Sequence, residues 1–308
     1  MIMRSPGSTR EEEAALEILR SVRRIEIKSK RLVQELFSGS YHTVFKGRGI
    51  EFSEVREYVP GDDVRSIDWN VTARMSHPFV KQYHEERERS VVFVVDRSAS
   101  MEFGSSARRL KWVAAETTAL LALSAAANQD KAGLLLFSDQ LEKWVPPRKG
   151  RSHILRIVRE VLFHESESTG TRISEALDRV NRTLRRRSLV FLISDFLRDT
   201  AYSDSLLLAS RKHEVIPLVL IDPREEELPS VGLVYNVDPE TGRRWMIDTS
   251  SARVREEFRA KAAARRQSRV AAFRRAGVEG VEIRLDQDTV APLAAYFRKR
   301  ERRRAAGR

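Results

Sequence analysis

The spacing of apolar residues changes at about residue 90. From there, short continuous apolar runs alternate with longer segments whose apolar residues recur every three or four positions. Such runs are typical of strands buried on both faces of a parallel sheet, and such segments of helices packed against it. The runs predict strands over residues 91–95, 132–137, 189–193, 215–221 and 281–285, and one apolar run before them predicts a strand over residues 79–83. The periodic segments predict helices over residues 107–128, 152–163, 173–185, 202–211, 252–275 and 290–298.

This alternation predicts an α/β fold with a doubly wound, mostly parallel sheet and right-handed crossovers. We place the α/β domain over residues 89–300 and a basic tail over residues 301–308. A strand over residues 142–145 is expected to pair with the strand before it as a hairpin. A second, small hairpin is expected as an insertion over residues 231–248, with a Pro-Glu-Thr-Gly turn.

The first 88 residues have a different pattern. Apolar residues close to a 3.6-residue period predict one helix over residues 11–37. The stretch over residues 41–74 contains a Pro-Gly-Asp-Asp turn and is expected to be irregular. Residues 1–88 are therefore expected to form an N-terminal helix and an irregular wrap on the α/β domain.

Composition narrows the class of protein. The 308 residues include no cysteine, which excludes disulfides and thiolate chemistry. No apolar run approaches the ~20 residues that cross a bilayer, and the polar N-terminus lacks a signal-peptide core. We therefore expect a cytoplasmic protein.

The net charge of +12 raises the alternative of nucleic-acid binding. Basic residues cluster over residues 20–31, 182–187, 253–275 and 298–308. Most of these stretches are predicted helices, on which charge runs are usually solvated faces. Because no nucleic-acid motif and no interleaved aromatic residues accompany them, binding to nucleic acid is the less favoured interpretation.

Candidate metal ligands follow the predicted strands. Asp96, Ser98 and Ser100 come directly after the strand over residues 91–95, and Asp195 follows another apolar strand. Thr171 lies in a loop that opens a helix. In doubly wound sheets, ligands bind beyond the carboxyl ends of the strands, so these oxygens are expected to converge. A set of oxygen ligands with two carboxylates favours Mg²⁺ or Mn²⁺ over zinc or copper.

These five residues resemble the metal-ion-dependent adhesion site of von Willebrand factor A domains. In that family an Asp-x-Ser-x-Ser loop, a Thr and a distal Asp hold Mg²⁺, and a carboxylate of a partner protein completes the shell. The resemblance implies that Asp96, Ser98, Ser100, Thr171 and Asp195 hold the ion here.

The preceding segment resembles the signature of the bacterial "domain of unknown function fifty-eight" family, and so does the hairpin turn over residues 238–242. Its polar and aromatic residues are Glu51, Arg56, Tyr58, Asp62, Asp63, Arg65, Asp68, Trp69 and Arg74. We expect them to form a structural wrap, with aromatic anchors and Arg–carboxylate pairs. A second acidic site or a docking face is the alternative. The family implies a cytoplasmic A-type domain that is often encoded near a MoxR-type AAA+ ATPase. We therefore expect that ATPase or its client as the partner.

The function expected from the sequence is that of a metal-dependent, protein-binding adaptor or assembly factor. The chain has no phosphate-binding loop, no dinucleotide fingerprint, no HExxH and no GxSxG. Its six histidines lack metal-ligand spacing. We therefore expect that it is not an enzyme, and a metal-dependent hydrolase at Asp96 and Asp195 remains the catalytic alternative.

Overall fold

The computed structural model describes residues 50–75, 77–85, 90–105, 108–198 and 201–306. The helix expected over residues 11–37 lies outside these ranges. The chain divides into two compact units, of which one is Phe45–Glu88 and the other contains Arg89–Arg308. We call them the signature unit and the α/β body and describe each by itself.

A six-stranded sheet forms the centre of the α/β body, in the order β10-β7-β6-β3-β4-β5. All neighbouring strands are parallel except β5, which is antiparallel to β4. The strands are β3 (Ser90–Asp96), β4 (Lys131–Phe137), β5 (Leu141–Arg148), β6 (Leu189–Ser194), β7 (Glu214–Ile221) and β10 (Val281–Arg284). The predicted α/β fold with a doubly wound, mostly parallel sheet is confirmed. The expected hairpin partner of β4 is also present, as the edge strand β5.

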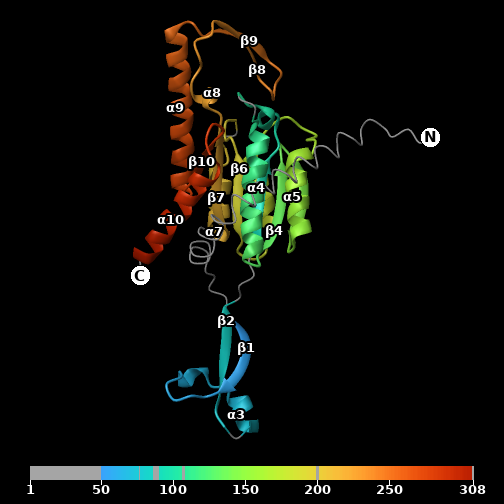
Figure 1. Ribbon diagram of the computed structural model, residues 1–308, viewed down its shortest axis with the longest axis vertical. Helices are drawn as coiled ribbons and strands as arrows, with labels where there is room; N and C mark the ends of the chain where they lie inside the picture. The colour runs from blue at the N-terminus through green and yellow to red at the C-terminus, as the bar shows by residue number, and fades with distance from the viewer. Residues whose placement is uncertain (1–49, 76, 86–89, 106–107, 199–200, 307–308) are drawn as a thin grey trace, which may run out of the picture. The chain divides into compact units, whose positions relative to one another are not determined.

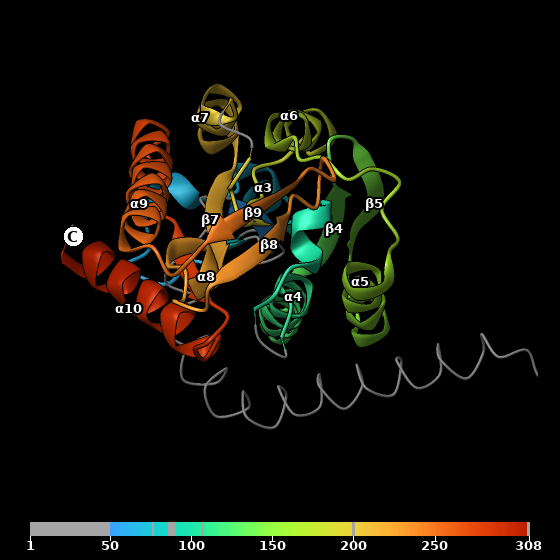
Figure 2. The ribbon, with the colours of Figure 1, turned by 90° about the horizontal axis from the view of Figure 1, so that it is seen from above.

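Helices cover both faces of this sheet (Figure 2). Helices α4 and α5 lie on one face, whereas α6, α7 and α9 lie on the other, where Phe273 of α9 joins the buried cluster formed by α6, α7 and the strands. The helices are α4 (Leu110–Ala127), α5 (Arg151–Phe163), α6 (Ile173–Thr183), α7 (Ser203–Lys212), α8 (Pro223–Glu226), α9 (Ala252–Arg275) and α10 (Val290–Ala306). Helix α10 is longer than predicted and takes in most of the stretch expected as a basic tail.

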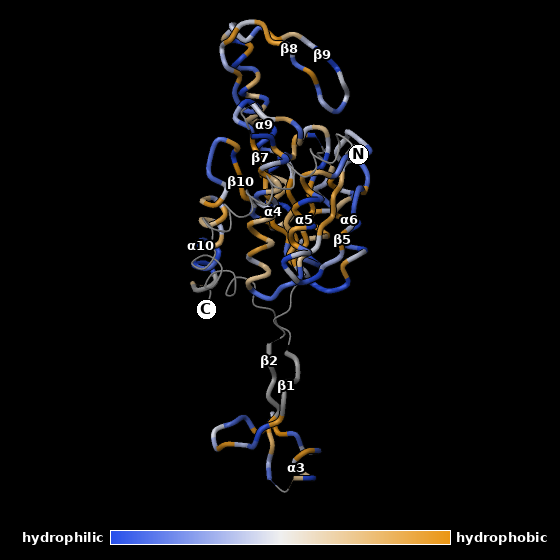
Figure 3. Tube along the Cα trace, turned by 45° about the vertical axis from the view of Figure 1, so that its right-hand side comes forward, coloured by the Kyte–Doolittle hydropathy of each residue, from blue (hydrophilic) through white to orange (hydrophobic). Residues whose placement is uncertain are grey.

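The interior of the α/β body is strongly apolar, as the orange tube in Figure 3 shows. Strands β3 and β6 are buried along nearly their whole length. The hydroxyls of Thr117 and Ser124 in α4 are buried, and they donate to the carbonyls of Val113 and Leu120, each at 2.7 Å. Among the described helices none is long and apolar enough to cross a membrane.

The expected small hairpin is formed by β8 (Leu233–Val237) and β9 (Arg244–Asp248), which pair antiparallel. It leaves the body after α8 and returns at the start of α9. Figures 1 and 2 show that it arches across the end of the sheet at which β3 and β6 finish.

The signature unit is more regular than the sequence predicts. Strands β1 (Ile50–Glu57) and β2 (Phe79–Glu85) form an antiparallel pair. A short 3₁₀ helix (Val64–Ser66) and α3 (Trp69–Met75) connect them. The prediction of an irregular stretch over residues 41–74 is therefore wrong where β1 and α3 form, whereas residues 58–63 form the predicted turn.

Candidate functional site

The loop after β3 begins inside the protein. Asp96 is the last residue of β3 and is fully buried, and Ser98 and Ser100 are also buried. The Ser98 N–H donates to Asp96 Oδ1 at 2.8 Å, and the hydroxyls of Ser98 and Ser100 lie 3.0 Å apart. Strand β3 lies between β4 and β6, where the order of strands reverses, so the loop sits where doubly wound sheets bind ligands.

The end of β6 supplies the second carboxylate. The Ser194 hydroxyl donates to Asp96 Oδ2 at 2.6 Å and so ties the two strand ends together. Asp195 is buried, and its Oδ1 accepts from the Leu197 N–H at 3.0 Å. Its Oδ2 is buried without a hydrogen-bond partner. A buried carboxylate oxygen with a free coordination position is available to a cation.

The backbone turns sharply after Asp195. Phe196 has a φ of 56°, in the left-handed region that non-glycine residues rarely adopt. Its ring packs edge-on against Tyr202 and Phe273, with centroids at 5.5 Å and 5.3 Å. Such a conformation costs about 1–3 kcal/mol and persists only where the surroundings enforce it. Packing of this aromatic cluster therefore fixes the direction of the Asp195 loop.

The two aspartates destabilise each other's charged forms. Burial, followed by the charge of Asp195, raises the pKa of Asp96 to about 7, against the hydrogen bonds from Ser194 and Ser98. Burial likewise raises the pKa of Asp195, whereas Ser100, the Leu197 N–H and the positive charge of Arg198 lower it. A divalent cation between the two carboxylates would relieve this repulsion.

Thr171 reaches the site through a loop that contacts its neighbours on both sides. The Ala99 N–H donates to the Thr169 carbonyl at 3.0 Å, and the Arg172 N–H donates to the Ser138 carbonyl at 2.9 Å. The Thr171 hydroxyl donates to Glu240 Oε1 at 2.9 Å. Glu240 lies in the turn of the β8–β9 hairpin. Sequence reasoning did not place it at the site, because nothing in its spacing indicates that the hairpin folds back over the sheet.

A third strand end adds acidic groups nearby. Asp222 follows β7, is fully buried, and accepts from the N–H and the hydroxyl of Ser105 at 2.6 Å and 2.5 Å. Glu225 in α8 is partly buried, and burial together with the charges of Asp195 and Asp222 raises its pKa to about 9. The end of the sheet thus gathers several carboxyl groups although the whole chain is basic.

The residues present fit a small divalent cation. Asp96, Ser98, Ser100 and Asp195 are brought together by the ends of β3 and β6, and Thr171 lies on the adjoining loop. Over the described ranges, no three His, Asp or Glu side chains are arranged to hold a metal by themselves. An ion here would therefore depend on hydroxyl and water oxygens in addition to two carboxylates, a ligand set that suits Mg²⁺ or Mn²⁺.

In the signature unit, the acidic residues make local bonds. Arg56 forms a bidentate pair with Asp62, both N–O distances being 2.7 Å, and the charge–charge hydrogen bond lowers the pKa of Asp62. Asp63 accepts from the Arg65 N–H and caps the 3₁₀ helix. Asp68 accepts from the N–H groups of Asn70 and Val71 at the start of α3. These bonds agree with a structural role for the three carboxylates.

The aromatic part of that expectation is wrong for Trp69, which is 70% exposed and is no buried anchor. Tyr58 is half-buried, and Arg65 and Arg74 are exposed. Glu51 belongs to β1, but its side chain lies outside the described part. Within the signature unit, Trp69 and the two arginines therefore belong to the surface.

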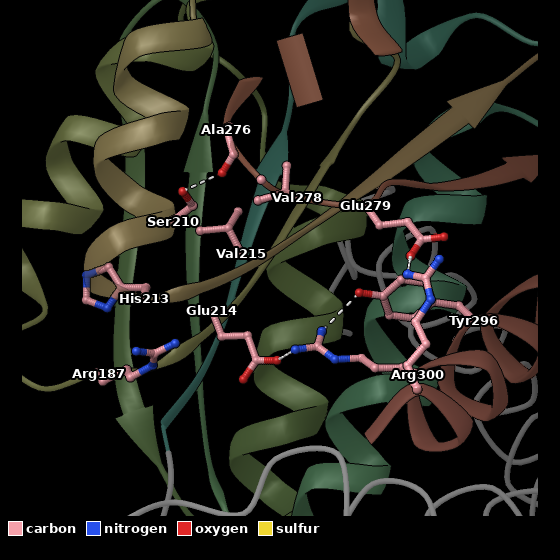
Figure 4. A pocket seen from close by; sticks show the side chains of 12 residues that line it. Arg187, Ser210, His213, Glu214, Val215, Ala276, Val278, Glu279, Tyr296 and Arg300 are labelled. Carbon is pink, nitrogen blue, oxygen red and sulfur yellow. Dashed lines mark hydrogen bonds and ion pairs between the residues drawn. The ribbon is translucent and has the colours of Figure 1, made fainter. Parts of the chain in front are cut away.

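A separate cavity of about 460 Å³ lies at the opposite end of the sheet, beside the start of β7 (Figure 4). Arg300 of α10 pairs with Glu214 and donates to the Tyr296 hydroxyl at 3.0 Å, and Arg303 pairs with Glu279 at 2.7 Å. Because these basic and acidic groups neutralise one another, the cavity is best described as the seam along which α10 packs.

The sheet order, the helical layers and the oxygen-rich strand ends define a von Willebrand factor A-like α/β protein. The model of the family described as "Protein of unknown function DUF58" matches residues 54–268. Uncharacterized protein Rv1480 of Mycobacterium tuberculosis is 33% identical over 291 residues, covering 93% of this chain and 91% of that protein. The chain therefore belongs to the DUF58 family, as its signature indicated.

Solved structures that resemble the fold include BatB from Bacteroides thetaiotaomicron, a conserved hypothetical protein. It is 16% identical, with a TM-score of 0.42, over 70% of this chain and 99% of that one. The SpRpn10 VWA domain is 10% identical, with a TM-score of 0.36, over 68% of this chain and 94% of that domain.

Proposed function

We propose that the chain is a divalent-metal-dependent adaptor or assembly factor, which binds an acidic residue of a partner protein at the ends of β3 and β6. It acts by binding and is not an enzyme. The observation that carries the proposal is the pair of buried carboxylates of Asp96 and Asp195, with one oxygen of Asp195 lacking any partner.

Asp96, Ser98, Ser100, Thr171 and Asp195 would hold Mg²⁺ or Mn²⁺. With only two carboxylates, the bound ion keeps its attraction for a further anionic oxygen, such as a Glu or Asp side chain of a partner. The partner implied by the resemblance of the signature is a MoxR-type AAA+ ATPase, or a client of that ATPase.

The surroundings of the site support binding over catalysis. The hydroxyls of Ser98 and Ser100 face each other, and no described His or Lys side chain bonds to either. Activation of a serine nucleophile needs such a base within hydrogen-bond reach.

The basic helices give little support to nucleic-acid binding. On α9, Arg259 pairs with Glu227 and Glu256, and Arg266 pairs with Glu282. Part of the positive charge that the sequence displays is thus neutralised in the fold.

The test combines metal binding with partner capture. Calorimetry should detect Mg²⁺ or Mn²⁺ binding to the full chain and none to Asp96→Ala. A matched control is Asp204→Ala, which removes an exposed carboxylate from α7. In a pull-down from native lysate, the partner should be retained by the wild type and by the control, and lost with Asp96→Ala or EDTA.

Tight zinc binding that depends on histidines would contradict the proposal, and so would partner capture that survives EDTA. An RNA or DNA signal at 260 nm that disappears in high salt, with no protein partner, would favour the nucleic-acid alternative.

A further inference from the structure

The turn of the β8–β9 hairpin, residues 238–242, lies on the candidate site. We call it the hairpin tip. Besides the bond from Thr171 to the Glu240 side chain, the Thr169 hydroxyl donates to the Glu240 carbonyl oxygen at 3.0 Å. The carboxylate of Glu240 is therefore hydrogen-bonded to one of the candidate ligands of the site.

The hairpin tip is internally ordered and tied to the loop that carries Asp195. Asp238 is buried and accepts from the Glu240 N–H at 3.1 Å and from the Thr241 hydroxyl at 2.8 Å. Arg198, three residues after Asp195, forms an ion pair with Asp238. These bonds hold Glu240 in one orientation, so its position over the site is built into the turn.

Apolar burial, by contrast, contributes little to the stability of the hairpin in this position. Its large apolar side chains are exposed: Leu233 is 66% exposed, Tyr235 76% and Met246 55%. Because the free energy gained from apolar burial scales with the area removed from water, these side chains contribute little. The hairpin tip is held by a few polar bonds at a solvent boundary, where the net contribution of each bond is small.

We propose that Glu240, which the structure places on Thr171, becomes an internal ligand of the candidate metal site once an ion is bound, and then occupies the position that a partner's carboxylate would take. This inference rests on the proposed metal-dependent function. The hairpin tip then acts as a competitor that a partner displaces. Only molecules whose Glu240 has left the ion can bind a carboxylate, so the apparent affinity of the wild type falls in proportion to that fraction. The site thus selects partners that contribute contacts beyond a single acidic residue.

The experiment compares wild type, Glu240→Ala and Glu240→Gln, each loaded with Mn²⁺. Alanine removes the carboxylate, whereas glutamine keeps an acceptor for Thr171 but removes the charge. Glu256→Ala is the matched control, because it removes an exposed carboxylate from α9. Water-proton relaxation of bound Mn²⁺ counts the exchangeable waters on the ion, and acetate is the probe for a free carboxylate.

Glu240→Ala should bind Mn²⁺ about tenfold more weakly and show about one additional exchangeable water per ion. Millimolar acetate should lower the relaxation in Glu240→Ala and leave wild type and Glu256→Ala unchanged. Glu240→Gln should resemble Glu240→Ala in its response to acetate.

Two failures are distinguishable. If the wild type binds Mn²⁺ but Glu240→Ala matches it in relaxation and in acetate response, the internal ligand is refuted and the metal site stands. If the wild type does not bind Mn²⁺ at all, the metal site and the internal ligand are both refuted.

A second measurement follows the hairpin itself. Because the chain has no cysteine, spin labels can be attached at Tyr235→Cys and Arg182→Cys alone. The distance distribution between them should be narrow with Mn²⁺ present and should broaden when Glu240→Ala is added. An unchanged distribution would mean that Glu240 does not hold the hairpin, and would overturn the inference.

Discussion

The burial of the carboxylates of Asp96 and Asp195 is unfavourable for folding. A buried carboxylate is stable when hydrogen bonds or an opposite charge compensate for its lost hydration. Asp96 receives bonds from Ser98 and Ser194, yet its pKa is still raised to about 7, and one oxygen of Asp195 has no partner. Such a pair is typical of a site kept for binding at some cost in stability.

Ser194 is the residue that orients Asp96. Its hydroxyl donates to Asp96 Oδ2 and accepts from the Phe196 N–H at 3.1 Å. We expect Ser194→Ala to weaken Mg²⁺ binding about 10–100-fold, the usual effect of removing an outer partner of a metal ligand. Calorimetry measures it. Ser210→Ala, which removes a hydroxyl bonded to the Ala276 carbonyl, is the control and should bind normally. Equal affinities in the two variants would exclude this role for Ser194.

His213 should give the fold a pH dependence that has nothing to do with the metal. The side chain is buried, and its Nδ1 accepts from the Ser188 N–H at 3.3 Å. Burial, then the charges of Lys212 and Arg187, lower the pKa of His213 to about 4. An unfolded histidine has a pKa of about 6.5. Because the unfolded chain binds this proton more tightly, the stability contributed by neutral His213 is complete above about pH 6.5 and is lost as the pH falls towards 4.

The measurement is urea unfolding of wild type and His213→Asn across that range. Asparagine offers an acceptor for the Ser188 N–H but does not titrate. The difference in unfolding free energy between the two proteins should therefore change in favour of the variant as the pH falls. A difference that stays constant would show that His213 keeps an ordinary pKa.

At the scale of residues, sequence spacing predicts that the candidate ligands after β3 and β6 lie together, because parallel strands end at one edge. Ser98, Ser100, Asp96 and Asp195 meet there. Glu240 could not be predicted in the same way. Its place depends on the path of a hairpin, which the alternation of apolar residues does not encode.

At the scale of elements, helices and parallel strands follow from periodicity, whereas β1 does not. The register between β1 and β2 shifts between Phe52 and Glu54, so a bulge interrupts the alternation by which a half-buried strand is recognised. Helix α10 exceeds its prediction for another reason. Beyond Arg298 the apolar period stops, but arginine, alanine and glutamate are all good helix formers and continue the helix to Ala306.

Truncation of two aromatic residues in different elements should change the free energy of unfolding by very different amounts. Phe297 of α10 is fully buried, and Phe297→Ala should lower the unfolding free energy by about 3–5 kcal/mol. Trp69→Ala at the exposed start of α3 should change it by about 0.5 kcal/mol or less. Chemical denaturation of both variants checks this contrast. A large loss from Trp69→Ala would mean that this ring is covered in the folded protein.

At the scale of the whole molecule, a basic chain gathers carboxyl groups at its candidate site. The net charge is +12, but Asp96, Asp195, Asp222 and Glu240 lie beyond the ends of the central strands. Net charge therefore describes the solvated helices and gives no guide to the chemistry of the site.

Ion binding should be visible as stability of the whole fold. At a Mg²⁺ concentration 100 times its Kd, the folded state gains about 2.7 kcal/mol. Asp96→Ala should lose this gain. Without metal it should be as stable as the wild type or more so, because removing one carboxylate removes its repulsion with Asp195. Thermal unfolding with Mg²⁺ and with EDTA measures both effects. If Asp96→Ala is unfolded in EDTA, Asp96 is needed for the fold itself.

The hairpin is fixed at its base and projects as a long arm, so a small rotation at the base moves its tip a long way. Its root is fixed beside α9, where buried Thr249 bonds to the Gly232 carbonyl at 2.6 Å and Arg255 bonds to the Thr249 carbonyl at 2.7 Å. Five-residue strands with a rise of about 3.4 Å per residue give an arm of about 17 Å. A rotation of about 20° at the root then carries the far end about 6 Å, more than the length of a hydrogen bond. A molecule that binds the exposed side chains of β8 would thus move the hairpin tip away from the candidate site without contacting the oxygens of that site.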